Sequence, residues 1–249
     1  MDDSSVIAEA GNDGAAAPVT LASSVYERLR GDILRGQLVP GHKLRIEFVS
    51  ERYAAGNSPV REALNRLSSD GLVQRRDQRG FYVAAASAED LVELTRTRCW
   101  LEETGLRESM RVYAPEWEEG VLLALHRLSR TPRSTSPAEY HENPEWERLH
   151  RAFHRSLIAG CGSRWLLAFC DQLADQAYRY RQLAVQRIYP KRKEKDEHAA
   201  IAQAVFKRDA DAAVALLTAH YRLTANIILK TGDVPMRDAS KKIAKGGSR

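Results

Sequence analysis

The chain has 249 residues, of which 43% are hydrophobic and 29% charged, so it is long enough for one large domain or two ordinary ones. Its longest apolar runs are too short to cross a bilayer, and its acidic, polar start lacks the features of a secretory signal. Three cysteines without a CxxC motif argue against a disulfide framework or a thiolate zinc site, and favour a cytoplasmic location with no membrane partner.

The positive charge is concentrated near the N-terminus. Residues 1–20 read as a disordered arm, and residues 21–86 then hold eleven Lys and Arg against seven Asp and Glu. This segment therefore has a net charge of +4, compared with +5 for the whole chain. Such a balance permits nucleic acid as a partner without requiring it.

Residues 21–86 show a pattern of three helices followed by a hairpin. The spacing predicts helices at 23–35, 46–53 and 59–71, and strands at 72–77 and 80–85. Ser58 is the expected N-cap of the third helix, and Gly71 suits its end. A short helix, a tight turn, a second helix and a basic hairpin are typical of a winged helix-turn-helix domain.

The second helix of such a domain enters the major groove of double-stranded DNA, and the hairpin lies along phosphates or a minor groove. The candidate DNA-contacting residues are Asn57, Ser58, Arg61, Arg66, Arg75, Arg79 and Gly80. Of these, Arg66 lies further along the helix and is expected to face the DNA backbone or solvent. The alternative is a helical subdomain with a solvated basic face.

From Ser87 onward the chain reads as helical. The expected helices are 86–113, 115–130, 143–159, 164–188, 191–207 and 209–230, with Ser87 and Asp209 as caps. Six such helices can pack as a bundle over residues 87–230, followed by a flexible tail at 231–249. The predicted fold class is therefore mainly α, with an N-terminal winged helix-turn-helix domain and a C-terminal all-α bundle.

Four histidines in the bundle form a candidate metal site. His150 and His154 are four residues apart on one helix, about 6 Å from each other, and can chelate one divalent ion. His198 lies ten residues before Arg208, and His220 lies eleven residues after Asp209, so an antiparallel pair of helices brings them to one level. The alternative is a chance pair on a surface rich in His and Arg.

The N-terminal segment resembles the DNA-binding domain of the GntR superfamily of bacterial regulators. The matching stretches are VYERLRGDILRGQLVPGHKL, PVREALNRLSSDGLVQRR and RGFYV, in that order. The family usually has Val-Ser-Arg-Thr-Pro before the second helix, whereas this chain has Ala-Gly-Asn-Ser-Pro at 55–59. Asn57 replaces the usual Arg, and Asn prefers adenine where Arg prefers guanine.

The bundle resembles the FCD domain, the ligand-binding domain of the FadR branch of this superfamily. The matching stretches are residues 97–109, 150–166 and 197–220, and six helices suggest the VanR-like subgroup. Many members hold a divalent metal with an Asp and three His. The resemblance places His154, His198 and His220 on those histidines and His150 on the Asp. Four imidazoles favour zinc, with nickel also suited.

The resemblance also assigns an effector-binding role to Arg98. In the family, the matching Arg points into the bundle cavity and pairs with a carboxylate, for which the forked guanidinium is suited. The alternative is a surface ion pair with Glu102, four residues along the same helix.

The resulting hypothesis is a metabolite-responsive transcriptional regulator rather than an enzyme. We expect a homodimeric repressor that reads a palindromic operator and responds to a small organic acid bound beside the metal. The alternatives are a regulator that senses the metal directly and a metal-dependent hydrolase.

Overall fold

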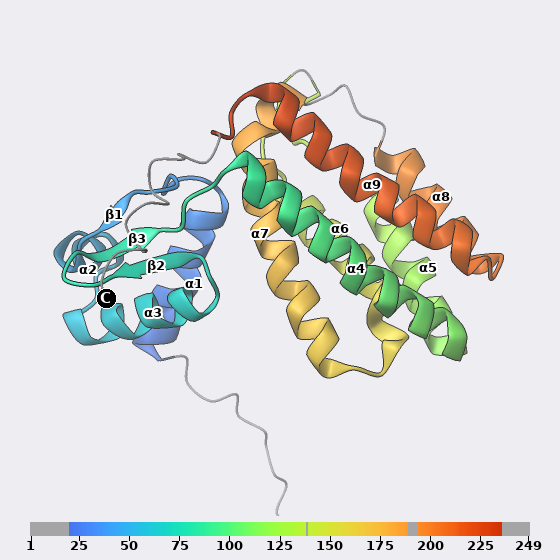
Figure 1. The fold of residues 1–249 in the computed structure, drawn as a ribbon, viewed down its shortest axis with the longest axis horizontal. Helices are drawn as coiled ribbons and strands as arrows, with labels where there is room; N and C mark the ends of the chain where they lie inside the picture. Colours follow the sequence, from blue (N-terminus) through green and yellow to red (C-terminus); the bar gives the residue numbers. More distant parts are fainter. Residues whose placement is uncertain (1–19, 138, 189–193, 236–249) are drawn as a thin grey trace, which may run out of the picture.

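The computed structural model describes residues 20–137, 139–188 and 194–235, which form two domains (Figure 1). The predicted arm at 1–20 lies outside the described residues except for Thr20, whose side chain caps the first helix. The N-terminal domain contains α1 (Leu21–Leu34), β1 (Lys43–Leu44), α2 (Ile46–Tyr53), α3 (Asn57–Ser69), β2 (Val73–Arg76) and β3 (Gly80–Val83). The C-terminal domain contains α4 (Ala88–Val112), α5 (Pro115–Arg130), α6 (Pro144–Ile158), η1 (Ala159–Cys161), α7 (Arg164–Ile188), α8 (Glu194–Phe206) and α9 (Ala210–Thr231).

The N-terminal domain has the predicted winged helix-turn-helix arrangement. Its sheet is antiparallel in the order β1-β3-β2, with Val73 opposite Val83 and Leu44 opposite Phe81. The two-residue strand β1 was not predicted, because it is too short to show an alternating pattern. Apolar side chains of all three helices, including Leu29, form one core beneath the sheet.

The start of α3 differs from the prediction. The N-cap is Gly56, whose backbone is extended with φ −71° and ψ 166°, so Ser58 lies inside the first turn and is not the cap. The predicted end is confirmed, because α3 stops at Ser69 and Gly71 has φ +72°. This left-handed conformation favours glycine, which has no Cβ to clash.

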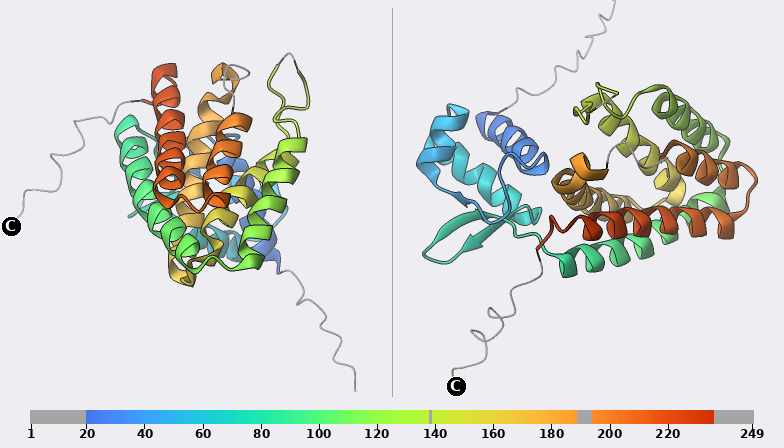
Figure 2. Two further views of the ribbon diagram at one scale, coloured as in Figure 1. Left: turned by 90° about the vertical axis from the view of Figure 1, so that its right-hand side faces the viewer. Right: turned by 90° about the horizontal axis from the view of Figure 1, so that it is seen from above.

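The six predicted helices of the bundle are present in the described residues as α4 to α9. The side chains of Ser87 and Asp209 accept hydrogen bonds from the first turns of α4 and α9, as predicted. The start expected for the fifth helix, at 191–193, lies outside the described residues. The long helices α4 and α9 run side by side in opposite directions (Figures 1 and 2). The bundle core includes Phe153, Ile201 and Leu217.

The C-terminal tail does not begin at Thr231 as a loose segment. Val234 is buried, and the backbone carbonyl of Pro235 accepts a hydrogen bond from the Ala88 amide at 2.9 Å. Residues 231–235 therefore pack against the start of α4, because α9 ends at Thr231 close to the first residues of α4. The remainder of the predicted tail, 236–249, lies outside the described residues.

Helix α9 is long and apolar enough, by length and composition, to span a bilayer. Its most apolar window has a mean hydropathy of 1.3, and 44% of that window is buried inside the structure. The buried side chains, including Leu217, Tyr221 and Ile228, pack in the bundle. The apolar character of α9 is thus explained by its place among α4, α7 and α8.

The two domains meet where α1 packs against α7. Gln176 donates a hydrogen bond to the Asp70 carbonyl at 3.2 Å, and Arg179 donates one to the Ala85 carbonyl at 2.8 Å. Viewed from above, α1 lies next to the bundle (Figure 2). A helix of the bundle therefore supports the domain that carries α3.

Candidate metal centre and DNA-reading surface

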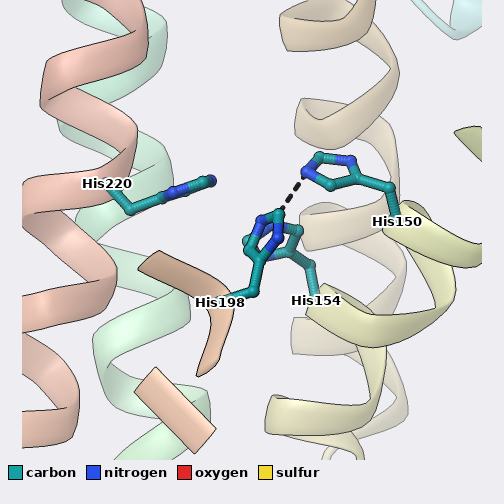
Figure 3. Close-up of side chains that lie close together, drawn as sticks. All are labelled: His150, His154, His198 and His220. Carbon is teal, nitrogen blue, oxygen red and sulfur yellow. Dashed lines mark hydrogen bonds between the residues drawn. The ribbon is translucent and has the colours of Figure 1, made fainter. Parts of the chain in front are cut away.

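The structure brings the four predicted metal ligands together. His150 and His154 project from α6, His198 from α8 and His220 from α9, and their rings converge (Figure 3). One ligand atom from each lies within 4.8 Å of the others. All four are buried, with exposed fractions between 2% and 9%, so the cluster is not a surface feature.

The spacing of two ring nitrogens fits a shared ion. His150 Nε2 and His154 Nε2 are 3.2 Å apart. Two nitrogens that each lie about 2.1 Å from a tetrahedral zinc ion are themselves about 3.4 Å apart. The four residues thus suit a zinc ion in donor type, and the His150–His154 pair also suits it in spacing.

Neighbouring side chains orient two of the rings. The Tyr221 hydroxyl forms a short hydrogen bond with Glu102 Oε2 and lies 2.9 Å from His154 Nδ1. Since Tyr221 gives its only proton to the carboxylate, His154 Nδ1 must be the donor to the Tyr221 oxygen. His154 Nε2 then carries the lone pair that faces the cluster.

The ring of His220 is oriented in the same way. Its Nδ1 is 2.8 Å from Glu197 Oε2, and a carboxylate can only accept, so Nδ1 carries the proton. This assignment leaves His220 Nε2 with a lone pair for a metal. Carboxylate partners of this kind fix the tautomer and raise the basicity of a histidine ligand.

The site keeps its histidines neutral. Burial lowers the pKa of His150 and His154 well below 6.5, and nearby positive charges lower it further. Any protonated cluster histidine would repel a charge on its neighbours, Arg181 repels a charge on both residues, and Arg98 repels one on His154. Only neutral imidazole can bind a metal, so burial prepares both residues as ligands.

Arg98 has features of both roles considered for it, the ion pair with Glu102 and a position in the bundle cavity. Its Nε donates to Glu102 Oε1 at 2.6 Å, which is the i,i+4 ion pair, and its guanidinium lies 3.9 Å from the centre of the Tyr221 ring. However, its side chain is only 13% exposed, so the pair is not at the surface. Arg98, Glu102, Tyr221 and His154 therefore form one connected chain of contacts.

His150, His154 and His220 line a cavity of about 300 Å³ together with Arg98. Its lining contains eight arginines and five acidic residues, so the neutral histidines sit in a positively charged chamber. The excess of positive charge favours an anionic occupant, and a bound divalent ion would strengthen that preference.

The partners of the histidines were missed from the sequence. Tyr221 and Glu197 directly adjoin His220 and His198 in the chain, but residues adjacent along a helix point in different directions. Glu197 forms a hydrogen bond with His220 on α9, although its neighbour in the chain is His198. This contact depends on the packing of α8 on α9, which the sequence does not show.

The predicted DNA-reading residues of α3 lie at its exposed N-terminal end. Asn57, Ser58 and Arg61 are exposed, and Asn57 Oδ1 accepts a hydrogen bond from Ser50 of α2 at 3.0 Å. Arg66 is different: its guanidinium lies 4.2 Å from the centre of the Tyr26 ring and donates to Ser23. Arg66 is thus held against α1 rather than grouped with the start of α3.

The hairpin presents the remaining predicted residues. Arg75, Arg79 and Gly80 are exposed at the tip, where Gly80 has φ +87° and Gln78 has φ +58°. Arg76 instead lies over the Tyr82 ring, 4.2 Å from its centre. The hairpin therefore offers two outward-facing arginines beside a tight turn.

Comparison with known proteins decides the family. The model for bacterial regulatory proteins of the gntR family matches residues 21–83, and that for the FCD domain matches residues 93–223. The chain belongs to the GntR family. This GntR regulator is a DNA-binding transcriptional regulator with an FCD domain, and its relatives are regulators rather than enzymes, so the hydrolase alternative is wrong.

Two curated relatives cover most of the regulator. The uncharacterized HTH-type transcriptional regulator BphR of Paraburkholderia xenovorans is 36% identical over 87% of this chain and 91% of its own. The HTH-type transcriptional repressor GlaR of Escherichia coli is 34% identical over 78% of this chain and 90% of its own.

Solved structures share the fold at low sequence identity. E. coli McbR/YncC superposes with a TM-score of 0.69 at 19% identity, over 86% of this chain and 99% of that chain. A GntR regulator from Rhodococcus sp. RHA1 gives a TM-score of 0.67 at 21% identity, over 84% and 97% of the two chains. The predicted fold class, with its two domains, is confirmed.

Proposed function

We propose that this GntR regulator is a metabolite-responsive repressor whose bundle binds one divalent metal ion and a small organic acid. The single observation that carries this proposal is the cluster of four buried histidines, three of which line one cavity with Arg98. Zinc is the metal that best suits four neutral imidazoles, with nickel as the alternative. When bound, the ion would supply a positive charge that attracts a carboxylate.

Arg98 is the proposed effector-binding residue. Its guanidinium has one contact to Glu102 through Nε, and a planar fork of this kind can engage a second carboxylate with its remaining nitrogens. Because Glu102 also receives the Tyr221 hydroxyl, an acid bound at Arg98 is connected to the ligand His154. This connection supports a common site for metal and acid.

A direct metal sensor is the second candidate function. Four histidines can complete a tetrahedral zinc site and leave no open position for a carboxylate. In that case the ion itself would be the signal. The excess of arginines in the cavity favours the organic acid instead, because a saturated metal site needs no further cations around it.

The oligomeric state and location follow from DNA recognition. We infer a homodimer in the cytoplasm, since two copies of the winged helix-turn-helix domain match the two half-sites of a palindromic operator. The direction of regulation, repression, is supported by the relative named as the repressor GlaR. The exposed start of α3 and the arginines at the hairpin tip are the proposed DNA contacts.

Metal content tests the site directly. Wild-type protein should bind about one zinc ion per chain, and the double variant His150→Ala/His154→Ala should bind none tightly. The matched control is His126→Ala, which removes an exposed histidine outside the cluster and should keep full stoichiometry. Equal zinc binding by the double variant and the wild type would refute the site.

A further inference from the structure

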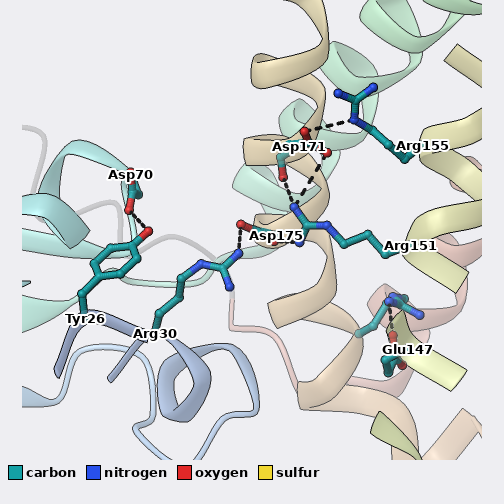
Figure 4. A network of polar contacts seen from close by, with 9 residues as sticks. Tyr26, Arg30, Asp70, Glu147, Arg151, Arg155, Asp171 and Asp175 are labelled. Carbon is teal, nitrogen blue, oxygen red and sulfur yellow. Dashed lines mark hydrogen bonds and ion pairs between the residues drawn. The ribbon is translucent and has the colours of Figure 1, made fainter. Parts of the chain in front are cut away.

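An ion pair joins the DNA-binding domain to the bundle at the end of the cavity. Arg30 of α1 pairs with Asp175 Oδ2 of α7, and Arg151 of α6 pairs with the other oxygen, Asp175 Oδ1 (Figure 4). We call this arrangement the Asp175 bridge. One carboxylate thus holds a cation from each domain.

The Asp175 bridge is connected to the metal centre by geometry. Arg151 directly follows His150 on α6, and the same cavity is lined by Arg30, Arg151, His150 and His154. The cavity therefore extends from the histidine cluster to α1. A ligand at the metal can influence Arg151 through the shared helix, or through the cavity itself.

The Asp175 bridge is also the part of the domain interface that a charged ligand in the cavity can affect. Arg30, Arg151 and the neighbouring Arg155 make their side-chain ion pairs with Asp175 and Asp171, so an anion in the cavity competes with Asp175 for its cations (Figure 4). The other interdomain hydrogen bonds described above end on the backbone carbonyls of Asp70 and Ala85. Those acceptors are neutral and are not exchanged for a bound acid.

We propose that Asp175 is the coupling residue between the effector cavity and the DNA-binding domain. Its carboxylate holds α1 against the bundle through Arg30, and changes at Arg151 alter that hold. Without Asp175, two guanidinium groups face each other across the interface and repel. The DNA-binding domain is then held less rigidly against the bundle. Operator binding weakens, because the two DNA-binding domains of the proposed dimer lose more conformational freedom when they bind the DNA.

A double-mutant cycle on operator DNA selected by the wild-type protein tests this proposal. Asp175→Asn and Arg30→Gln should each weaken operator binding by about fivefold or more. The double variant should be no weaker than either single variant, because both changes remove the same ion pair. The matched control is Asp211→Asn at the start of α9, whose partner is Arg107 of α4, away from the interface between the domains; it should bind operator like the wild type.

Each variant should keep the wild-type zinc stoichiometry and Tm, which excludes a folding defect. Operator binding by Asp175→Asn equal to that of wild type, or effects of the two single variants that simply add, would overturn the proposal. The inference rests on the proposed function, but different results would refute the Asp175 bridge and the proposed function. If zinc and acids never alter operator binding, the proposed function fails even when the cycle is positive; an additive cycle refutes only the bridge.

Discussion

At the scale of single residues, the proposed metal centre depends on groups that are not themselves proposed ligands. Tyr221 and Glu197 each fix the tautomer of one histidine, so that its Nε2 faces the cluster. The clustering of the four histidines could be predicted from spacing and resemblance, because a helical period determines which residues share a face. Their partners could not, since these contacts depend on which helices become neighbours.

Replacing Tyr221 by Phe should weaken zinc binding by about 10–100-fold, because His154 Nδ1 loses the acceptor that fixes its tautomer. Competition with a chelating dye measures the affinity. Tyr113→Phe is the matched control: this hydroxyl also donates to a carboxylate, that of Glu118, but at the end of α4 away from the histidines. An unchanged affinity in Tyr221→Phe would contradict the assigned tautomer.

The metal-free protein should lose stability as the pH falls below about 6.5. Burial lowers the pKa of His150 and His154, so the unfolded chain binds more protons than the folded one in the window below 6.5. Stability is therefore greatest above that pH and declines through the window. Urea unfolding after chelation, repeated over the pH range, measures the slope.

The control for this slope is His150→Leu/His154→Leu, which has no buried imidazole on α6 to protonate. Its free energy of unfolding should depend less steeply on pH over the same window. Parallel pH curves for the double variant and the wild type would show that other groups account for the acid sensitivity.

At the scale of elements, the sequence predicted most helices and the hairpin, but not their exact ends. The cap of α3 moved from Ser58 to Gly56 because the chain already turns into the helix at Asn57. Strand β1 escaped prediction because it consists of two residues held by pairing with β3. Long periodic segments such as α4 and α9 were clear, since many residues contribute to the pattern.

Asp32 joins α1 to α2, and its loss should destabilise the DNA-binding domain. It accepts hydrogen bonds from Arg52 and Tyr53 at 2.8 Å. Burial alone would raise the pKa of Asp32, but these donors outweigh it and hold the pKa below its usual range. Asp32→Asn should lower the free energy of unfolding by about 2 kcal/mol, because the donors lose a charged acceptor.

Chemical denaturation of the full chain measures this effect, with unfolding monitored by the loss of the α-helical signal and of operator binding. Asp77→Asn, at the exposed hairpin turn, is a control of the same chemistry without burial and should change stability little. Equal stability of the two variants would refute the role of Asp32 as a link between α1 and α2.

At the scale of the whole molecule, the order of the two domains was readable from motifs, but the way in which they touch was not. Arg30 and Asp175 are 145 residues apart. Arg30 lies in a stretch that resembles the GntR superfamily, but Asp175 lies outside the stretches that resemble the FCD domain. Contacts of this kind arise from packing α1 on α7. The coupling between sensing and DNA binding is therefore a property of the assembled fold.

Large apolar side chains are exposed on two adjacent helices of the bundle, and we expect them to form the contact of the proposed homodimer. Trp100 of α4 and Trp165 of α7 are 59% and 67% exposed, and α4 packs on α7. The double variant Trp100→Asp/Trp165→Asp should sediment as a monomer at concentrations where the wild type is a dimer. Leu122→Asp, at a similarly exposed site on α5, should leave the dimer intact; a dimeric double variant would exclude this surface.

The central claim is that an acid bound in the histidine cavity controls operator binding. The most direct measurement is operator affinity in three states of one preparation: chelated, zinc-loaded, and zinc-loaded with each of a panel of small carboxylic acids. The account predicts that at least one acid changes the affinity of the zinc-loaded protein by about fivefold or more, while zinc alone changes it little. A full response to zinc alone, with no effect of any acid, would contradict it and identify the protein as a metal sensor.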